Sequence, residues 1–158
     1  MSRVKSSPLI QLVDEVSRLQ GRFTSLFEPV QSYSGLKRMG DLVLNAVYEA
    51  DSPPTVPQIG RSLGHPRQVI QRVVNELAAD GLLERLPNPD HKRAPLLGVT
   101  DRGRALKETT DDVALDIANT FLQYAADAEE CTRLARELRE LRRALEAFAR
   151  ETQEADEA

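Results

Sequence analysis

Features that are scarce in this 158-residue chain exclude several classes of protein. Cys131 is the only cysteine, so an intrachain disulfide framework is excluded and a reducing compartment is expected. No uncharged run approaches the roughly 20 apolar residues that a membrane-spanning helix needs. The first residues lack the apolar core of a secretory signal. We therefore expect a cytoplasmic protein with no membrane partner.

The sequence motifs of common enzymes are also missing. There is no Gly-rich loop ending in Lys-Ser or Lys-Thr, no GxGxxG fingerprint and no nucleophile elbow. His65, His91 and Cys131 are separated by 26 and 40 residues, which is not a metal-ligand spacing. The carboxylates cluster in the terminal segments as solvated faces. We expect no enzymatic activity, no cofactor and no metal site.

The excess of acidic side chains is distributed unevenly. The chain has 21 Lys and Arg against 25 Asp and Glu, a net charge of −4 that by itself argues against a nucleic-acid partner. Residues 61–104, however, hold 8 basic and 5 acidic side chains, a net of +3. Residues 105–158 carry a net of −7. An anionic partner is therefore expected at the middle of the chain, with the acidic segment away from it.

Apolar periodicity predicts a mostly α fold with a small β component (α+β). Helical spacing covers residues 8–33, 36–50, 56–63, 66–80 and 100 onward, with a break near 125–127. Residues 82–86 and 96–99 read as two strands around a loop with three prolines. Two helices joined by a tight turn at Gly64, followed by a charged hairpin, indicate a winged helix-turn-helix. The expected divisions are an N-terminal dimerisation helix over 1–35, the DNA-binding domain over 36–100 and C-terminal dimerisation helices over 101–158.

Local signals refine the helix ends. Ser7 is expected to cap the first helix, Thr55 the helix that begins at Val56, and Thr100 the helix that follows the hairpin. Gly103 is a weak position in the first turn of that helix, because glycine lowers helix stability. The tail from Glu151 to Ala158 is expected to fray.

Apolar stripes on the terminal helices exceed what a winged helix needs for its own core. The stripe residues assigned to a dimer interface are Leu9, Leu12, Val16, Leu134, Leu138, Leu141, Leu145 and Phe148. The last five have the alternating spacing of a heptad seam. Cys131 falls on this seam, where it is expected to act as a small buried hydrophobe rather than a redox sensor. Leu26, Val30 and Tyr33 could line a ligand pocket or form core, and core is favoured. These stripes predict a homodimer.

The helix over 66–80 has one aliphatic face and one polar face. The polar side chains assigned to DNA reading are Arg67, Gln68, Gln71, Arg72 and Asn75. Arginine pairs with guanine and glutamine or asparagine with adenine in the major groove. The alternative is a solvated face that contacts nothing. Glu76 and Asp80 lie only in the C-terminal half of this helix, which favours DNA reading.

The hairpin tip carries His91, Lys92 and Arg93 on a proline-stiffened loop. Such a tip can reach phosphates or a minor groove. The alternative is a charged turn in solvent. The helix-turn-helix that precedes the tip favours the contact with DNA.

Two stretches carry a resemblance to a known family. The first stretch is Leu63-Gly64-His65-Pro66-Arg67-Gln68-Val69-Ile70-Gln71-Arg72-Val73-Val74-Asn75-Glu76-Leu77. The second is Asn88-Pro89-Asp90-His91-Lys92-Arg93-Ala94-Pro95, followed by Val99-Thr100-Asp101-Arg102-Gly103. Together they resemble the helix-turn-helix and the wing of the MarR family of bacterial transcription regulators. The resemblance implies a homodimer that grips a palindromic double-stranded DNA operator. It also implies a repressor that is released by a small phenolic or lipophilic effector. In most members an acidic residue precedes the two basic wing residues, and here that position is His91.

Two functions remain open from the sequence. The first is a sequence-specific DNA-binding regulator of transcription. The second is a winged-helix protein–protein interaction module without DNA binding, to which the acidic C-terminal helix would contribute. The first is favoured, because a protein-docking module has no need of the polar side chains Arg67, Gln68, Gln71 and Arg72 on one face.

Overall fold

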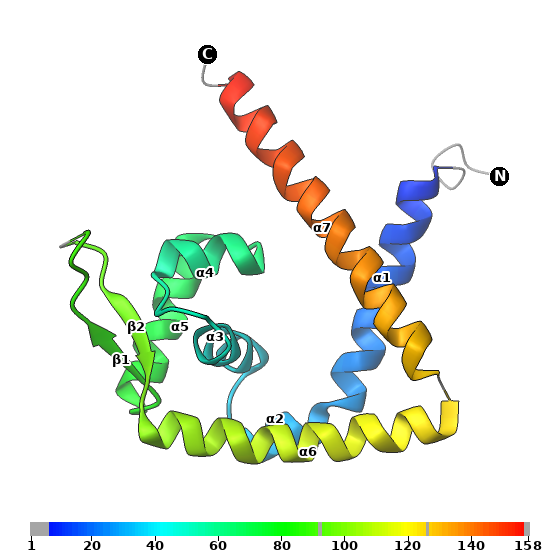
Figure 1. Cartoon of the computed structure of the whole chain (residues 1–158), viewed down its shortest axis with the longest axis horizontal. Coiled ribbons are helices and arrows are strands. Elements are labelled where there is room, and N and C mark those ends of the chain that lie inside the picture. The colour runs from blue at the N-terminus through cyan, green and yellow to red at the C-terminus, as the bar shows by residue number, and fades with distance from the viewer. Residues whose placement is uncertain (1–6, 92, 126, 157–158) are drawn as a thin grey trace. The chain divides into compact units, whose positions relative to one another are not determined.

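The computed structural model describes residues 7–91, 93–125 and 127–156 (Figure 1). Within them the elements are α1 (Pro8–Leu26), α2 (Glu28–Ser34), α3 (Arg38–Tyr48), α4 (Val56–Leu63), α5 (Arg67–Ala79), β1 (Leu83–Leu86), β2 (Leu96–Val99), α6 (Asp101–Ala125) and α7 (Ala128–Asp156). The expected mostly α winged-helix fold is confirmed. The chain forms two compact units that meet inside α6, one through Ile117 and one from Ala118. Across the described ranges, every helix is too short or too polar to cross a bilayer.

The first predicted helix is two helices, so the expectation of one helix over 8–33 is wrong. α1 ends at Leu26 and α2 begins at Glu28, with Phe27 between them at φ −97° and ψ 14°. Pro29 explains the break, because it has no amide hydrogen to donate to Ser25 and its ring would clash with that carbonyl in a continued helix. The cap expected from Ser7 is also wrong, since its side chain makes no capping hydrogen bond.

The helix-turn-helix follows the sequence signals closely. The Thr55 amide donates to Gln58 Oε1 at 2.7 Å, which fixes the start of α4 at Val56. Gly64 ends α4 with φ +68°, a left-handed conformation that favours glycine. The His65 amide then donates to the Gly60 carbonyl at 2.9 Å and closes the turn into α5. The angle between α4 and α5 is thus set by backbone geometry.

One aliphatic core holds α3, α4, α5 and the hairpin together. Its buried side chains are Val43, Leu44, Val47, Val56, Ile59, Ile70, Val73, Val74, Leu77, Leu82, Leu83 and Leu97. β1 and β2 pair antiparallel from Leu83 opposite Val99 to Leu86 opposite Leu96. The Leu97 amide donates to the Pro54 carbonyl at 2.8 Å. The wing is therefore attached both to α5 and to the segment that leads into α4.

The start of α6 is tied to the end of α5. Thr100 Oγ1 accepts from the Gly103 amide at 3.0 Å, which confirms the expected cap, and donates to the Gly81 carbonyl at 2.7 Å. Gly103 is buried there. A β-carbon at this position would lie 2.1 Å from the Leu82 carbonyl oxygen, so packing requires glycine here despite its low helix propensity.

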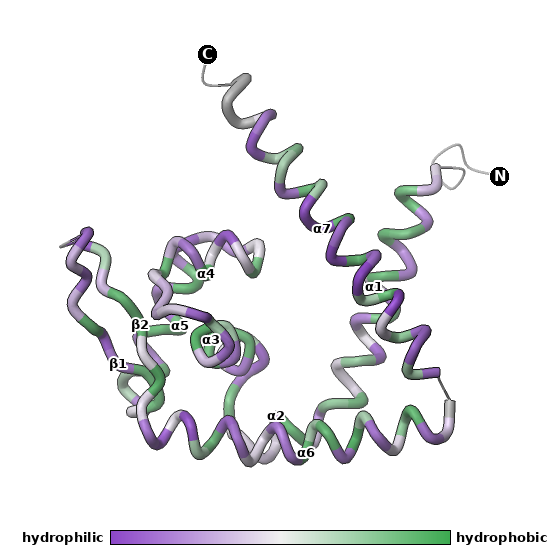
Figure 2. The backbone as a smooth tube through the Cα atoms, in the orientation of Figure 1, coloured by the Kyte–Doolittle hydropathy of each residue, from purple (hydrophilic) through white to green (hydrophobic). Residues whose placement is uncertain are grey.

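Hydrophobic residues recur along both terminal helices between hydrophilic ones (Figure 2), and most of the large ones are exposed. On α1 these are Leu9, Leu12 and Val16, and on α7 they are Leu134, Leu138, Leu145 and Phe148, with Leu141 half-buried. Cys131 is exposed in the single chain, as its neighbours on the same stripe are, so its expected burial in a dimer seam stays a prediction. α7 extends to Asp156, so the fraying expected from Glu151 is wrong over those residues. Ion pairs one turn apart, such as Arg142 with Glu146 at 2.7 Å, favour this continuous helix.

Candidate nucleic-acid interface

α5 presents its polar face to solvent and its aliphatic face to the core. Ile70, Val73, Val74 and Leu77 are buried. Of the side chains assigned to DNA reading, Gln68, Gln71, Arg72 and Asn75 share the opposite face, and Arg67 lies beside it in the first turn; all are exposed except Gln71, which is half-buried. A row of exposed guanidinium and amide groups on one helix can enter a major groove. The structure therefore brings together all five residues predicted on this helix.

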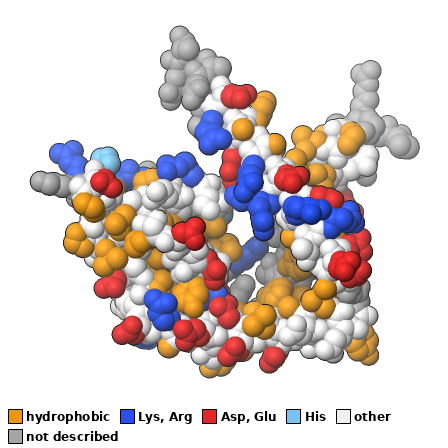
Figure 3. Space-filling model, in the orientation of Figure 1, with side chains coloured by type: hydrophobic (Ala, Val, Ile, Leu, Met, Phe, Trp, Pro, Cys, Tyr) orange, Lys and Arg blue, Asp and Glu red, His pale blue; other side chains and the backbone are white. Residues whose placement is uncertain are grey.

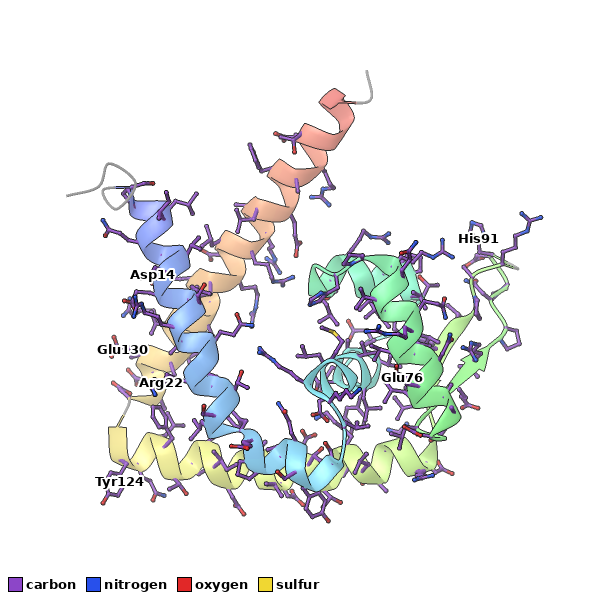
Figure 4. The ribbon with its side chains drawn as sticks, turned by 180° about the vertical axis from the view of Figure 1, so that it is seen from behind. Asp14, Arg22, Glu76, His91, Tyr124 and Glu130 are labelled. Carbon is purple, nitrogen blue, oxygen red and sulfur yellow. The ribbon has the colours of Figure 1, made fainter. Side chains whose placement is uncertain are left out.

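Hydrogen bonds order part of this face. Gln71 Nε2 donates to Asn75 Oδ1 at 3.1 Å, and Arg85 Nη2 from β1 donates to the same oxygen at 2.6 Å. Arg72 Nε lies 3.9 Å from Glu76 Oε1, one turn away (Figure 4 labels Glu76). Arg85 was missed from the sequence, because only the hairpin's packing on α5 brings it to this face.

The wing loop is held in shape by Asn88. Its Nδ2 donates to the Ala94 carbonyl at 2.7 Å and its Oδ1 accepts from the Asp90 amide at 3.0 Å. The Ala94 amide also donates to the His91 carbonyl at 3.0 Å, closing the turn. His91 and Arg93 are exposed, and Figure 4 labels His91 at the tip of the hairpin. In Figure 3, basic side chains and a histidine lie together on the surface at this tip. Lys92, the third residue predicted there, lies outside the described residues.

A cationic cleft lies between α4, the start of α5 and the wing. It has a volume of about 680 Å³, and its cationic lining comes from Arg61, Arg67 and Arg93, with His91 at the rim. Asp90 is the one carboxylate among its described lining residues. The charge suits a phosphate backbone. Arg61 was missed from the sequence because nothing in α4 alone distinguishes it from a solvated arginine.

A second cavity, of about 380 Å³, lies between the end of α1, α2, α3 and the first half of α6. Its apolar walls are Phe23, Phe27, Val30, Leu42 and Leu106. Val30 thus lines a cavity instead of filling core, and Tyr33 is exposed, so the core assignment was wrong for both. Polar and charged side chains, among them Arg38, Asp41, Asn45 and Lys107, line the rest of the cavity. A cavity that combines apolar walls with polar groups is typical of a small-molecule site.

The polar groups of this cavity include a carboxylate with an unpaired oxygen. Asp41 Oδ2 is buried and has no hydrogen-bond partner among the described residues. Burial raises the pKa of Asp41, while a hydrogen bond from Ser34 and the charge of Lys107 offset part of that rise. Lys107 is buried, pairs with Asp111, and lies 5.3 Å from the centre of the Tyr48 ring. The ionised carboxylate of Asp41 in this cavity therefore lowers the stability of the fold.

The raised pKa of Asp41 predicts a pH-dependent gain of stability in Asp41→Asn. A raised pKa in the folded state means that the ionised carboxylate destabilises the fold above that pKa, and that the penalty disappears as the pH falls through it. The gain should therefore be largest at pH 7 and shrink toward pH 4. Urea unfolding at both pH values measures it, and Asp112→Asn, at an exposed aspartate of α6, is the control. A gain that grew on acidification would contradict the assignment.

Comparisons with known proteins find a matching family and a similar curated protein. Residues 34–94 match the family described as MarR. The chain is 36% identical over 122 residues to the uncharacterized protein Rv2011c of Mycobacterium tuberculosis, covering 77% of this chain and 83% of that protein.

Solved structures show the same fold. A MarR-family transcriptional regulator from Rhodococcus sp. RHA1 has a TM-score of 0.74 at 18% identity, covering 87% of this chain and 96% of that chain. CouR from Rhodococcus jostii RHA1, bound to p-coumaroyl-CoA, has a TM-score of 0.68 at 19% identity, covering 90% and 96%. With the winged-helix fold, the exposed polar side chains of α5 and this family match, the chain belongs to the MarR family of transcription regulators.

Proposed function

We propose that this chain is a sequence-specific double-stranded DNA-binding repressor that reads a palindromic operator as a homodimer and is released by a small-molecule effector. One observation carries the proposal. The polar face of α5 and the cationic cleft beside it are adjacent, because Arg67 belongs to both. Base edges and phosphates can therefore be contacted from one surface.

The exposed stripes of α1 and α7 support the homodimer. Each presents a row of large apolar side chains, such as Leu12 on α1 and Leu138 on α7, that costs free energy in water. A second copy would cover both rows under two-fold symmetry. Two α5 helices held about 34 Å apart would then read successive turns of a palindrome.

The cavity lined by Phe23, Phe27 and Leu106 supports the effector. CouR holds an acyl-CoA ligand, p-coumaroyl-CoA, on a similar fold. A small phenolic or lipophilic molecule fits the apolar walls of the cavity here. Because the cavity borders both α1 and the winged helix through α3, a ligand with higher affinity for one arrangement of these helices would shift the DNA-binding equilibrium.

Two variants test the interface. Arg72→Ala should weaken binding to the selected operator by about 1–3 kcal/mol and relax one base preference, if the guanidinium makes a bidentate contact.

Arg93→Ala at the wing should weaken binding to all sequences and lower the salt slope by about 1. Titrations of upstream DNA at two salt concentrations measure both effects.

The same titrations separate this proposal from a protein-docking winged helix. Neutralising phosphates makes affinity fall steeply with salt. Binding to DNA that did not change with salt, or no binding to any DNA, would favour the interaction module and refute the role of Arg93 and of the cleft.

A further inference from the structure

Asn75 has its side-chain oxygen fully engaged within the protein. The oxygen accepts one hydrogen bond from Arg85 Nη2 at 2.6 Å and another from Gln71 Nε2 at 3.1 Å. The three side chains come from the second and third turns of α5 and from β1. All belong to the surface proposed to face DNA.

The chemistry of arginine fixes the orientation of the Asn75 amide. A guanidinium donates hydrogen bonds and cannot accept them, so the Asn75 atom that faces Arg85 must be the oxygen. A carbonyl oxygen has two lone pairs, and both are used by the two donors. The side chain of Asn75 therefore offers only its two N–H groups to any further partner.

An asparagine in this state reads bases differently from a free one. A free asparagine recognises adenine by accepting from N6 and donating to N7. With its oxygen occupied, Asn75 cannot accept from N6. Guanine presents two acceptors, N7 and O6, in the major groove and suits a group that only donates.

We propose that Arg85 is a specificity-determining residue, which acts by making Asn75 a donor-only reader that selects guanine over adenine. The inference rests on the proposed reading of DNA by α5. Arg85 can hold this position because its strand is fixed, with Arg85 paired opposite Leu97 and the adjoining Leu83 buried in the core. Arg85 is a positioning residue in this account, since it acts on the base through Asn75.

The first test uses the free protein. Side-chain amide resonances of Asn75 and Gln71 are compared in the wild type, Arg85→Ala and Arg85→Lys. Loss of the guanidinium should move the Asn75 amide signals in Arg85→Ala, and Arg102→Ala, at an exposed arginine of α6, should leave them in place. Unmoved Asn75 signals in Arg85→Ala would overturn the proposal without any reference to DNA.

The second test is selection of operators from randomised DNA. The wild type should select guanine at the base that loses its preference in Asn75→Ala. Arg85→Ala should accept adenine at that base, which lowers the guanine-to-adenine ratio about tenfold. Arg85→Lys keeps a hydrogen-bond donor and should retain part of the preference for guanine. The Asn75→Ala/Arg85→Ala double variant should match Asn75→Ala in base preference at that position.

The outcomes separate the two proposals. A selected operator whose base preferences are unchanged in Arg85→Ala, with only a uniform loss of affinity, would mean that Arg85 contacts phosphate directly, and would overturn this inference alone. Failure of the wild type to select any sequence would refute the proposed function, and this inference with it.

Discussion

Gly103→Ala should destabilise the fold by about 3 kcal/mol or more, an effect at the upper end of those seen for overpacking. A β-carbon at this position would lie 2.1 Å from the Leu82 carbonyl oxygen and 2.9 Å from Val99 Cγ1. The Leu82 oxygen has little freedom to move, because it also accepts from the Thr100 amide at 3.2 Å. Relief of the clash requires α6 to move away from the end of α5 and the hairpin.

Gly21→Ala is the matched control. Gly21 lies inside α1, and a β-carbon there would meet no atom within 4 Å. Alanine is the better helix former, so this variant should gain about 0.5–1 kcal/mol. Urea unfolding monitored by circular dichroism compares the two variants. Equal stability of Gly103→Ala and the wild type would show that α6 is not packed against Leu82.

Gly103 also shows where reasoning from local sequence ends. Helix propensity treats the residue as a cost in the first turn of a helix, and it assigns a similar cost to Gly21. The two positions differ in what surrounds them, because Gly103 faces a backbone carbonyl from a segment about 20 residues earlier in the chain. No periodicity or spacing carries that information.

Elements defined by local chemistry were predictable. α4 was predicted to the residue, because Thr55, Gly64 and the two apolar positions of the helix are all local signals. The hairpin was predicted from three prolines between two aliphatic runs. The break at Phe27 was also present in the sequence, as Pro29, but a continuous apolar stripe outweighed it in the interpretation.

For the candidate site too, only the features that depend on one element could be predicted from the sequence. The polar face of α5 follows from helical geometry alone, so Arg67 and Gln71 could be assigned. The bond from Arg85 to Asn75 and the unpaired oxygen of Asp41 depend on how separate elements pack. The cavity beside Asp41 is lined by four helices, and no one of them reveals it.

Leu138→Glu should convert the proposed dimer to monomers and abolish operator binding. Leu138 is an exposed leucine at the middle of the α7 stripe, between Leu134 and Leu141. In a two-fold interface the substitution occurs twice. Each copy loses the burial of a leucine, about 2 kcal/mol, and gains a carboxylate that must be desolvated without a partner, which costs several more. A monomer can grip only one half of a palindrome, so the loss of affinity for DNA should far exceed that of Arg72→Ala.

Thr132→Glu separates this effect from that of charge. Thr132 is exposed on α7, about 160° around the helix from Leu134 and so away from the stripe, and glutamate there adds the same negative charge. Sedimentation equilibrium should show a dimer for Thr132→Glu and a monomer for Leu138→Glu, with operator binding lost only in the second. Leu138→Glu should keep its winged helix folded, because the core of that domain does not involve α7. A Leu138→Glu protein that remained a dimer would place the dimer interface elsewhere, and the heptad seam of α7 would then have to serve another partner.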